Sequence, residues 1–183
     1  MSRIAILIST LDRPDGLDRL LSALARQRLA RIADADVAIV VVDNGREGRV
    51  AASVAGHPVA RRFAVRGLHE PRRGLSTARN AALAEADRMG AAFAAFVDDD
   101  EAPTTGWLEA LHARIASTGA AAATGPVAPV FATEPPRWMV RGGFHAKRRA
   151  SRDGLVDDAY TCNALVALDP VRRLGLRFDE ALN

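Results

Sequence analysis

The stretch Ala94-Ala95-Phe96-Val97, followed at once by Asp98-Asp99-Asp100-Glu101, decides how the rest of the chain is interpreted. The apolar part predicts a buried strand, and consecutive carboxylates follow it directly. Like charges this close repel one another, and a bound divalent cation removes that penalty because carboxylate oxygens are its natural ligands. The stretch therefore predicts a metal site at the carboxyl end of a central strand, with a solvated acidic turn as the alternative interpretation.

The composition is that of an ordinary globular protein, with 183 residues, 49% hydrophobic side chains and 26% charged ones. This length allows one domain with a sizeable core, and we expect a single domain over residues 1–183. The formal net charge is only +3 and Lys147 is the sole lysine, so the basic side chains are arginines, which suit phosphate and carboxylate. The small basic excess and the 5% aromatic content argue against a nucleic-acid partner.

The sequence also bears on the compartment. A single cysteine, Cys162, excludes an internal disulfide and a cysteine-based zinc cluster. The apolar run at residues 4–8 is too short for a signal peptide, and no apolar stretch approaches the roughly 18 residues of a membrane span. We expect a cytoplasmic protein. Arginines within residues 137–152 suggest peripheral contact with the inner face of a membrane, although such a charge run is more often simply solvated.

Apolar runs alternate with helical patterns over the first 130 residues. Strands are expected at residues 4–8, 37–42, 61–65, 93–97 and 121–130, the last of them interrupted by Gly125-Pro126. Helices are expected at residues 16–28, 47–55, 76–89 and 106–115, with Ser76 capping the third. This alternation predicts an α/β fold with an open, mostly parallel sheet flanked by helices.

The pattern is less regular beyond Val130. Prolines exclude a central strand or a helix interior at residues 133–138. Residues 141–153 are basic and contain glycine, so we interpret them as a mobile loop. Residues 160–168 return to strand-like apolar character, and Asp169-Pro170 is expected to start a short helix, with Asp169 as its cap.

Polar side chains follow several of the expected strands. In open α/β sheets, ligands bind outside the carboxyl ends of the strands. The segments that fall there are residues 10–13, Asp43-Asn44, Arg72-Arg73 and residues 98–100. Taken singly, Asp43-Asn44 is typical of a turn and Arg72-Arg73 is typical of a solvated face. Together they predict a nucleotide-diphosphate site.

Each part of this predicted site has a chemical role. Residues two apart on extended backbone point the same way, so Asp98 and Asp100 can share one metal ion that bridges two phosphates. Arg72 or Arg73 would pair with the same phosphates, and Asp43 would accept a hydrogen bond from a base N–H.

Six motifs in this order resemble the family 2 glycosyltransferases of the GT-A fold, whose open sheet is Rossmann-like. They are Thr10-Leu11-Asp12-Arg13, Val41-Val42-Asp43-Asn44, Gly74-Leu75-Ser76-Thr77-Ala78-Arg79-Asn80, Phe96-Val97-Asp98-Asp99-Asp100, Thr161-Cys162-Asn163-Ala164-Leu165-Val166 and Leu176-Arg177-Phe178-Asp179-Glu180. The resemblance covers essentially the whole chain. It implies a nucleotide-sugar-binding part at residues 1–130 and an incomplete acceptor-side part at residues 131–183.

The resemblance also implies a role for each donor-site residue. Asp43 would contact the base, commonly the uracil of a UDP-sugar. Asp100 would be the direct ligand of Mg²⁺ or Mn²⁺, with Asp98 beside it and nearer the ribose and sugar. The other donor-binding residues implied are Thr10, Asp12 and Arg13 in the nucleoside pocket, Arg73, Gly74 and Arg79 near the ribose or phosphates, and Asp99 within the Asp-x-Asp element.

The reaction implied is an inverting, metal-dependent sugar transfer to a saccharide or other glycoconjugate, as in the synthesis of a cell-surface polysaccharide. Such a transfer needs a carboxylate base, which the family places about ten residues beyond the motif matched by Phe178-Asp179-Glu180. That position lies past Asn183, so no catalytic residue is assigned.

Three alternatives stay open. The chain can be a donor-binding fragment impaired in catalysis. It can be a sugar nucleotidyltransferase, although the glycine-rich triphosphate loop expected after the first strand is absent from residues 10–13. It can also be a non-catalytic receiver domain of two-component signalling, although the lysine needed near its last strand is missing there.

Overall fold

The computed structural model describes residues 3–131, 133–143, 153–156 and 158–183. The strands are β1 (Ile4–Thr10), β2 (Val37–Asp43), β3 (Ala64–His69), β4 (Phe93–Phe96), β5 (Ala122–Thr124) and β6 (Ala164–Ala167). The α-helices are α1 (Pro14–Ala25), α2 (Val50–Gly56), α3 (Leu75–Arg88), α4 (Trp107–Thr118), α5 (Arg137–Gly142) and α6 (Leu168–Arg173). Short 3-10 turns are η1 (Asp34–Asp36), η2 (Pro58–Arg61) and η3 (Glu180–Leu182).

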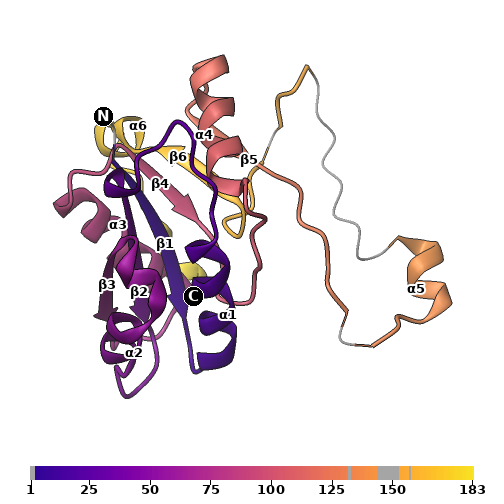
Figure 1. The fold of residues 1–183 in the computed structure, drawn as a ribbon, viewed down its shortest axis with the longest axis horizontal. Coiled ribbons are helices and arrows are strands. Elements are labelled where there is room, and N and C mark those ends of the chain that lie inside the picture. The colour runs from indigo at the N-terminus through magenta and orange to yellow at the C-terminus, as the bar shows by residue number, and fades with distance from the viewer. Residues whose placement is uncertain (1–2, 132, 144–152, 157) are drawn as a thin grey trace.

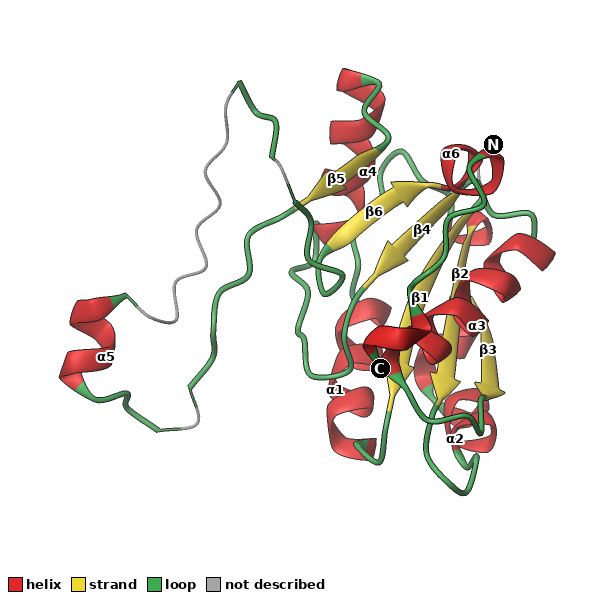
Figure 2. Ribbon diagram, turned by 180° about the vertical axis from the view of Figure 1, so that it is seen from behind, coloured by secondary structure: helices red, strands yellow, loops and turns green. Residues whose placement is uncertain are grey.

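The strands form one sheet in the order β3-β2-β1-β4-β6-β5. The pairs β1–β2, β1–β4 and β2–β3 are parallel, whereas β6 runs antiparallel to both β4 and β5. Figure 1 shows the strands spread across the view with helices on both faces of the sheet, and Figure 2 shows the sheet from behind. The predicted open, mostly parallel α/β sheet is confirmed.

Alternate residues of the central strands face two separate cores, as expected for strands covered on both sides. Ile4, Ile6 and Ile8 of β1 pack in a cluster with leucines of α1 and α4. Ala5 and Leu7 face the opposite cluster, which contains alanines of α3 and Leu168 of α6. Strand β1 is therefore buried on both faces, and its parallel pairing with β2 and β4 places the carboxyl ends of the three strands at one edge.

Several predicted strands have different bounds, and the strand-like segment expected at residues 160–168 is a strand only over Ala164–Ala167. The third begins at Ala64 rather than residue 61, because Pro58 starts the 3-10 turn η2 over the preceding residues. The fifth was expected at residues 121–130 but ends at Thr124, where Gly125 and then Pro126, which has no N–H to donate, terminate the pairing.

Two predicted helix caps are wrong. Helix α3 begins at Leu75, with Gly74 at the N-cap position, so Ser76 lies inside its first turn. The backbone N–H of Ser76 donates to the side-chain oxygen of Asn183 at 2.8 Å. Helix α6 has Ala167 as its N-cap, and Asp169 instead pairs with Arg173 one turn later at 3.0 Å.

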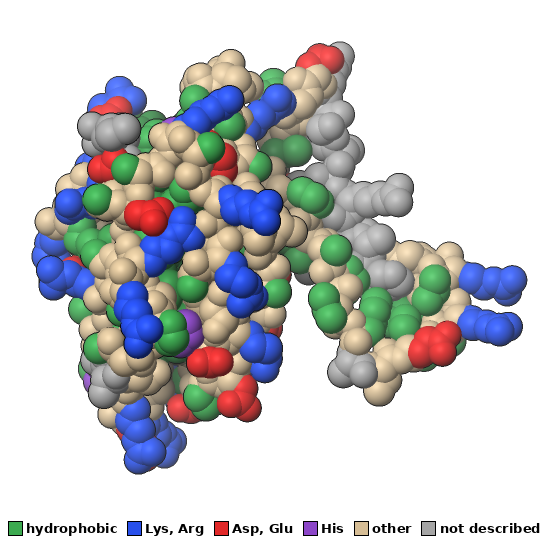
Figure 3. Space-filling model, in the orientation of Figure 1, with side chains coloured by type: hydrophobic (Ala, Val, Ile, Leu, Met, Phe, Trp, Pro, Cys, Tyr) green, Lys and Arg blue, Asp and Glu red, His purple; other side chains and the backbone are tan. Residues whose placement is uncertain are grey.

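The segment after β5 stands away from the sheet and carries α5 at its far end in both ribbon views. Figure 3 shows hydrophobic and basic side chains on this projecting segment, and Trp138 is 64% exposed. Most of the loop predicted at residues 141–153 lies outside the described residues, except that Arg141 and Gly142 belong to α5. No helix within the described ranges has the length and apolar content to cross a membrane. Peripheral membrane contact stays a prediction.

Candidate functional site

The carboxyl ends of β1, β2 and β4 bring the predicted site residues together. Thr10 ends β1 and lies opposite Asp43, which ends β2. The acidic run begins two residues after the last residue of β4 and reaches across to β1, since the Thr10 hydroxyl donates to Asp99 Oδ2 at 2.8 Å. The predicted convergence of these strand ends is confirmed.

The first half of the site is a pair of carboxylates around Gly45. The carboxylate of Asp43, a residue only 6% exposed, accepts hydrogen bonds from the backbone N–H of Gly45 at 2.7 Å and of Val50 at 3.3 Å. Asp12 has a φ of 52°, in the left-handed region that costs most residues energy. A side chain at position 45 would lie 2.8 Å from an oxygen of both Asp12 and Asp43, so only glycine fits between them.

Asn44 holds the neighbouring loop in place. Its side-chain amide donates to the carbonyls of Glu70 and Arg72, both at 2.8 Å, and its oxygen accepts from the N–H of Gly74 at 2.8 Å. Asn44 is 6% exposed, so these groups bond to one another with little help from water. Its position in Asp43-Asn44-Gly45 indicates a turn, but nothing in the sequence identifies the loop that it organises.

Arg73 and Gly74 lie on this loop, at the start of α3. Arg73 is exposed, and no hydrogen bond or ion pair to it is found among the described residues. Gly74 has a φ of 144°, and a side chain there would collide with the side chain of Asn183. The amide of Asn183 also donates to the Thr77 hydroxyl at 2.9 Å, so its carboxamide covers the start of α3.

The second half of the site is the acidic run. Asp99 is buried and accepts hydrogen bonds from Thr10 and from Arg13, whose Nη1 lies 3.2 Å from Asp99 Oδ1 and 3.1 Å from Asp100 Oδ2. The carboxylates of Asp98 and Asp100 are 38% and 60% exposed. Asp99 therefore anchors the run to β1, and its two neighbours remain accessible to a ligand.

The backbone of this run differs from the extended one on which the shared-ion prediction was based. The N–H of Glu101 donates to the carbonyl of Asp98 at 3.1 Å, which closes a turn over Asp99 and Asp100. The strict alternation expected through Asp100 is therefore wrong. That Asp98 and Asp100 bind a metal stays a prediction.

Arg79 places a cation beside Asp98. Its Nη2 donates to Asp98 Oδ1 at 3.1 Å, and its guanidinium carbon lies 5.5 Å from the centre of the Phe178 ring. Phe178 in turn packs edge-on against Phe96 at the end of β4, with ring centres 5.6 Å apart. Phe178 thus positions a predicted donor-site arginine, a role that no sequence pattern indicates.

Negative charge accumulates at this edge. The pKa of the Glu101 carboxyl is raised, first by burial and then by the negative charges of Asp100 and Asp98. The pKa of the nearby Cys162 thiol is raised by burial and by Glu101. The carboxylates of Asp99 and Asp100 raise the pKa of Arg13.

A hard divalent cation suits these oxygen ligands and this excess of negative charge. Within the described ranges, no three or more His, Cys, Asp or Glu side chains gather as a complete metal-binding group. Mg²⁺ and its relatives are commonly held by one or two carboxylates together with phosphates of the substrate. The residues present therefore fit an ion whose coordination a diphosphate completes.

The mostly parallel sheet, with carboxylates and arginines at its carboxyl edge, has the architecture of the GT-A fold. The model of glycosyl transferase family 2 matches residues 5–175, and the chain belongs to that family. The succinoglycan biosynthesis protein ExoM of Rhizobium meliloti (strain 1021) is 36% identical over 179 residues, which are 98% of this chain and 56% of that protein. The chain thus spans little more than half the length of this relative.

Solved structures share the fold. S. aureus TarS (residues 1–349) superposes with a TM-score of 0.74 at 17% identity, over 99% of this chain and 51% of that one. Its complex with UDP-GlcNAc gives a TM-score of 0.71 at 17% identity, over 97% and 48% of the two chains. The mannosyltransferase PcManGT of Pyrobaculum calidifontis, in complex with GDP-Man and Mn²⁺, superposes with a TM-score of 0.66 at 20% identity, over 94% of this chain and 46% of that one. The predicted GT-A fold is confirmed.

The Thr10→Val substitution tests how firmly the acidic run is tied to β1. Valine matches the shape of threonine but removes the donor to buried Asp99. We expect the free energy of unfolding to fall by about 1–2 kcal/mol, because a buried carboxylate then loses one of its partners. Urea unfolding measures this loss, and Thr10→Ser, which keeps the hydroxyl, is the control. Equal free energies of unfolding for the two variants would show that the Thr10–Asp99 hydrogen bond does not contribute to stability.

Proposed function

We propose that this chain binds a nucleoside-diphosphate sugar and acts as a metal-dependent, inverting glycosyltransferase. One observation carries the proposal. The carboxylate of Asp43, proposed to contact the nucleobase, and the acidic run at residues 98–100, proposed to contact the phosphates, lie at a single edge of the sheet, where the Thr10–Asp99 hydrogen bond joins two of the strand ends. Family membership supports the class of reaction.

The nucleoside is proposed to bind between the ends of β1 and β2. Asp43 is held rigidly by two backbone N–H groups, and oxygen lone pairs remain for a base N–H. Asp12 and Thr10 are proposed to line the same nucleoside site. A UDP-linked donor is favoured because TarS is known in complex with UDP and with UDP-GlcNAc.

The diphosphate is proposed to bind beside Asp98 and Asp100, with Mg²⁺ or Mn²⁺ held by these carboxylates. Such an ion, when bound, neutralises the charge that develops on the departing diphosphate. Arg79 keeps Asp98 oriented through its 3.1 Å contact, and Arg13 does the same for Asp100. The exposed Arg73 guanidinium is free to pair with phosphate oxygens.

The acceptor is proposed to be a saccharide or other glycoconjugate, since the relative ExoM is a succinoglycan biosynthesis protein. Inversion by a single displacement requires a base that takes the acceptor proton. The family motif for that base is not matched by any residue of this sequence. A chain that binds donor without transferring the sugar is the second candidate, and the same assays separate it from the first.

A donor screen tests the proposal. The melting temperature is measured with UDP-, GDP- and ADP-linked sugars in the presence of Mn²⁺, and the largest rise is expected with a UDP-sugar, the donor type in the TarS complexes. Release of UDP in the presence of saccharide acceptors would identify transfer, and binding without release would identify the second candidate. Release of pyrophosphate from a nucleoside triphosphate and a sugar phosphate would instead indicate a nucleotidyltransferase and contradict the proposal.

A further inference from the structure

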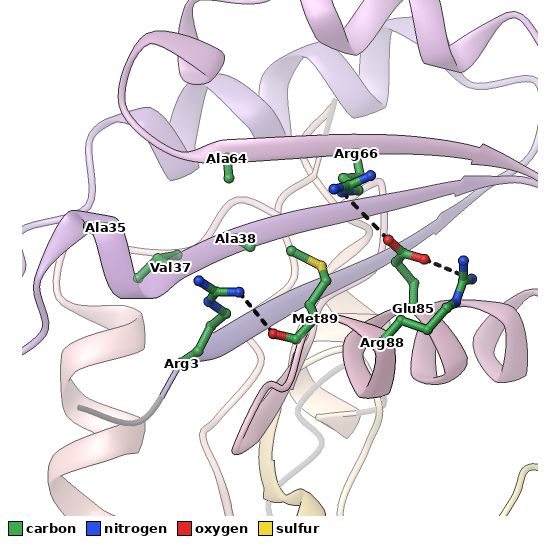
Figure 4. Close-up of a pocket in the computed structure, with 9 residues that line it drawn as sticks. All are labelled: Arg3, Ala35, Val37, Ala38, Ala64, Arg66, Glu85, Arg88 and Met89. Atoms are coloured by element: carbon green, nitrogen blue, oxygen red, sulfur yellow. Dashed lines mark hydrogen bonds and ion pairs between the residues drawn. The ribbon is translucent and has the colours of Figure 1, made fainter.

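A second cavity lies at the opposite edge of the sheet, where β1, β2 and β3 begin and α3 ends. It encloses about 490 Å³. Figure 4 shows the guanidinium groups of Arg3, Arg66 and Arg88 around it, together with the carboxylate of Glu85. Small side chains, including Ala38 of β2 and Ala64 of β3, line its floor and leave this space open. A volume of this size lies in the usual range of about 300–1,000 Å³ for small-molecule sites.

The charge in this cavity is unbalanced. Arg66 Nε lies 3.6 Å from Glu85 Oε1, and Arg88 Nη2 lies 2.7 Å from Glu85 Oε2. Arg3 donates to the carbonyl of Met89 at 2.9 Å, and no carboxylate among the described residues forms an ion pair with it. Two guanidiniums therefore share the Glu85 carboxylate and the third is not paired with it, so the residues that line the cavity carry a net positive charge.

Glu85 stands out on its helix. Its neighbours on the buried face of α3 include the apolar Ala82 and Ala86. Glu85 carries a carboxylate, yet its side chain is only 5% exposed. A buried carboxylate costs free energy, and its partners Arg66 and Arg88 are 62% and 67% exposed, where ion pairs contribute little stability. Glu85 holds two guanidiniums in the lining of the cavity, one on each side of its carboxylate (Figure 4).

We propose that this cavity binds a phosphate monoester with a compact apolar group. Arg66 and Arg88 each keep free N–H donors, and a guanidinium pairs with two phosphate oxygens at once. The alanine floor then takes the apolar group. The phosphate can belong to a free small molecule or to the headgroup of an acidic lipid. This site lies at the amino ends of the strands and is independent of the donor site at their carboxyl ends.

Phenyl phosphate is the probe, followed by the backbone amide shifts of the ¹⁵N-labelled chain. We expect the largest shifts at Arg3, Arg66 and residues 85–89, and weaker binding at higher salt. In the double variant Arg66→Gln/Arg88→Gln the affinity is expected to fall about tenfold for each guanidinium removed. Arg19→Gln, at an exposed position on α1, is the control and is expected to bind as the unaltered chain does.

The double glutamine variant leaves Glu85 without a cation, so Arg66→Lys/Arg88→Lys is the second variant. It keeps the charge and the fold but loses the bidentate geometry, and it is expected to bind several-fold more weakly than the unaltered chain. Shifts confined to the carboxyl edge, or an affinity unchanged in both double variants, would overturn the proposal.

Vesicles separate the two sources of phosphate. Phosphatidylcholine vesicles with and without phosphatidic acid are sedimented with the chain. Binding that requires phosphatidic acid and falls in the double lysine variant assigns the site to a lipid headgroup. Binding of phenyl phosphate without binding to either vesicle assigns it to a free phosphorylated molecule.

Discussion

The Asp100→Asn variant is expected to bind UDP without help from Mn²⁺. Asp100 is the predicted direct ligand of the ion, and its carboxylate is 60% exposed, so it is available to a ligand. Replacing it removes a hard oxygen ligand of full negative charge. We expect the gain in UDP affinity that Mn²⁺ brings to be lost, since even outer-shell changes cost about 10–100-fold in metal affinity and Asp100 is the predicted direct ligand.

The fold of this variant should be intact. Its stability without metal is expected to change by no more than about 0.5 kcal/mol, because the residue is exposed. Asp36→Asn, at the opposite edge of the sheet, is the matched control and should keep the full response to Mn²⁺. If Asp100→Asn responds to Mn²⁺ as the unaltered chain does, the ion binds elsewhere.

The Asn44→Ala variant is expected to lose both stability and nucleotide affinity. The substitution removes three hydrogen bonds and leaves two loop carbonyls and the N–H of Gly74 without partners. Each such group costs about 1–3 kcal/mol when buried, and water reaches part of this loop, so we expect a loss of about 3 kcal/mol in total. For a domain of this size, that corresponds to a melting temperature lower by about 6–12 °C.

A comparison with Asn163→Ala separates the two effects. The Asn163 side chain accepts from the Trp107 indole at 2.8 Å and donates to the carbonyl of Pro126 at 2.9 Å, so its loss also destabilises the fold. It does not touch the loop at residues 70–74. UDP affinity, measured well below both melting temperatures, should fall in Asn44→Ala and not in Asn163→Ala. An equal fall in both would show that Asn44 acts only through stability.

The central strands and their shared edge could be predicted because each signal is local. Runs of buried β-branched and apolar residues such as Val37–Asp43 end abruptly in polar residues, and parallel strands place those ends together. Strand β3 was placed too early because it is a half-exposed edge strand whose apolar signal is weak. In both cases the strength of the prediction followed the depth of burial.

The details of the site depend on contacts between distant segments. The burial of Asp99 requires Thr10, which lies 89 positions earlier in the chain. The start of α3 is covered by Asn183 rather than capped by Ser76, and that contact spans 107 positions. The cavity beside Glu85 needs side chains from several elements. Residue type and spacing carry no information about such pairs, so they appear only in the folded chain.

We infer that the carboxyl edge of this sheet is a metal-dependent site for a nucleoside diphosphate. Calorimetric titration of the unaltered chain with UDP, in Mn²⁺ and then in EDTA, tests it most directly. We expect saturable binding of one UDP in Mn²⁺, and binding at least about tenfold weaker, by about 1.4 kcal/mol, in EDTA. Equal affinities in the two conditions, or no binding of UDP in either, would contradict it.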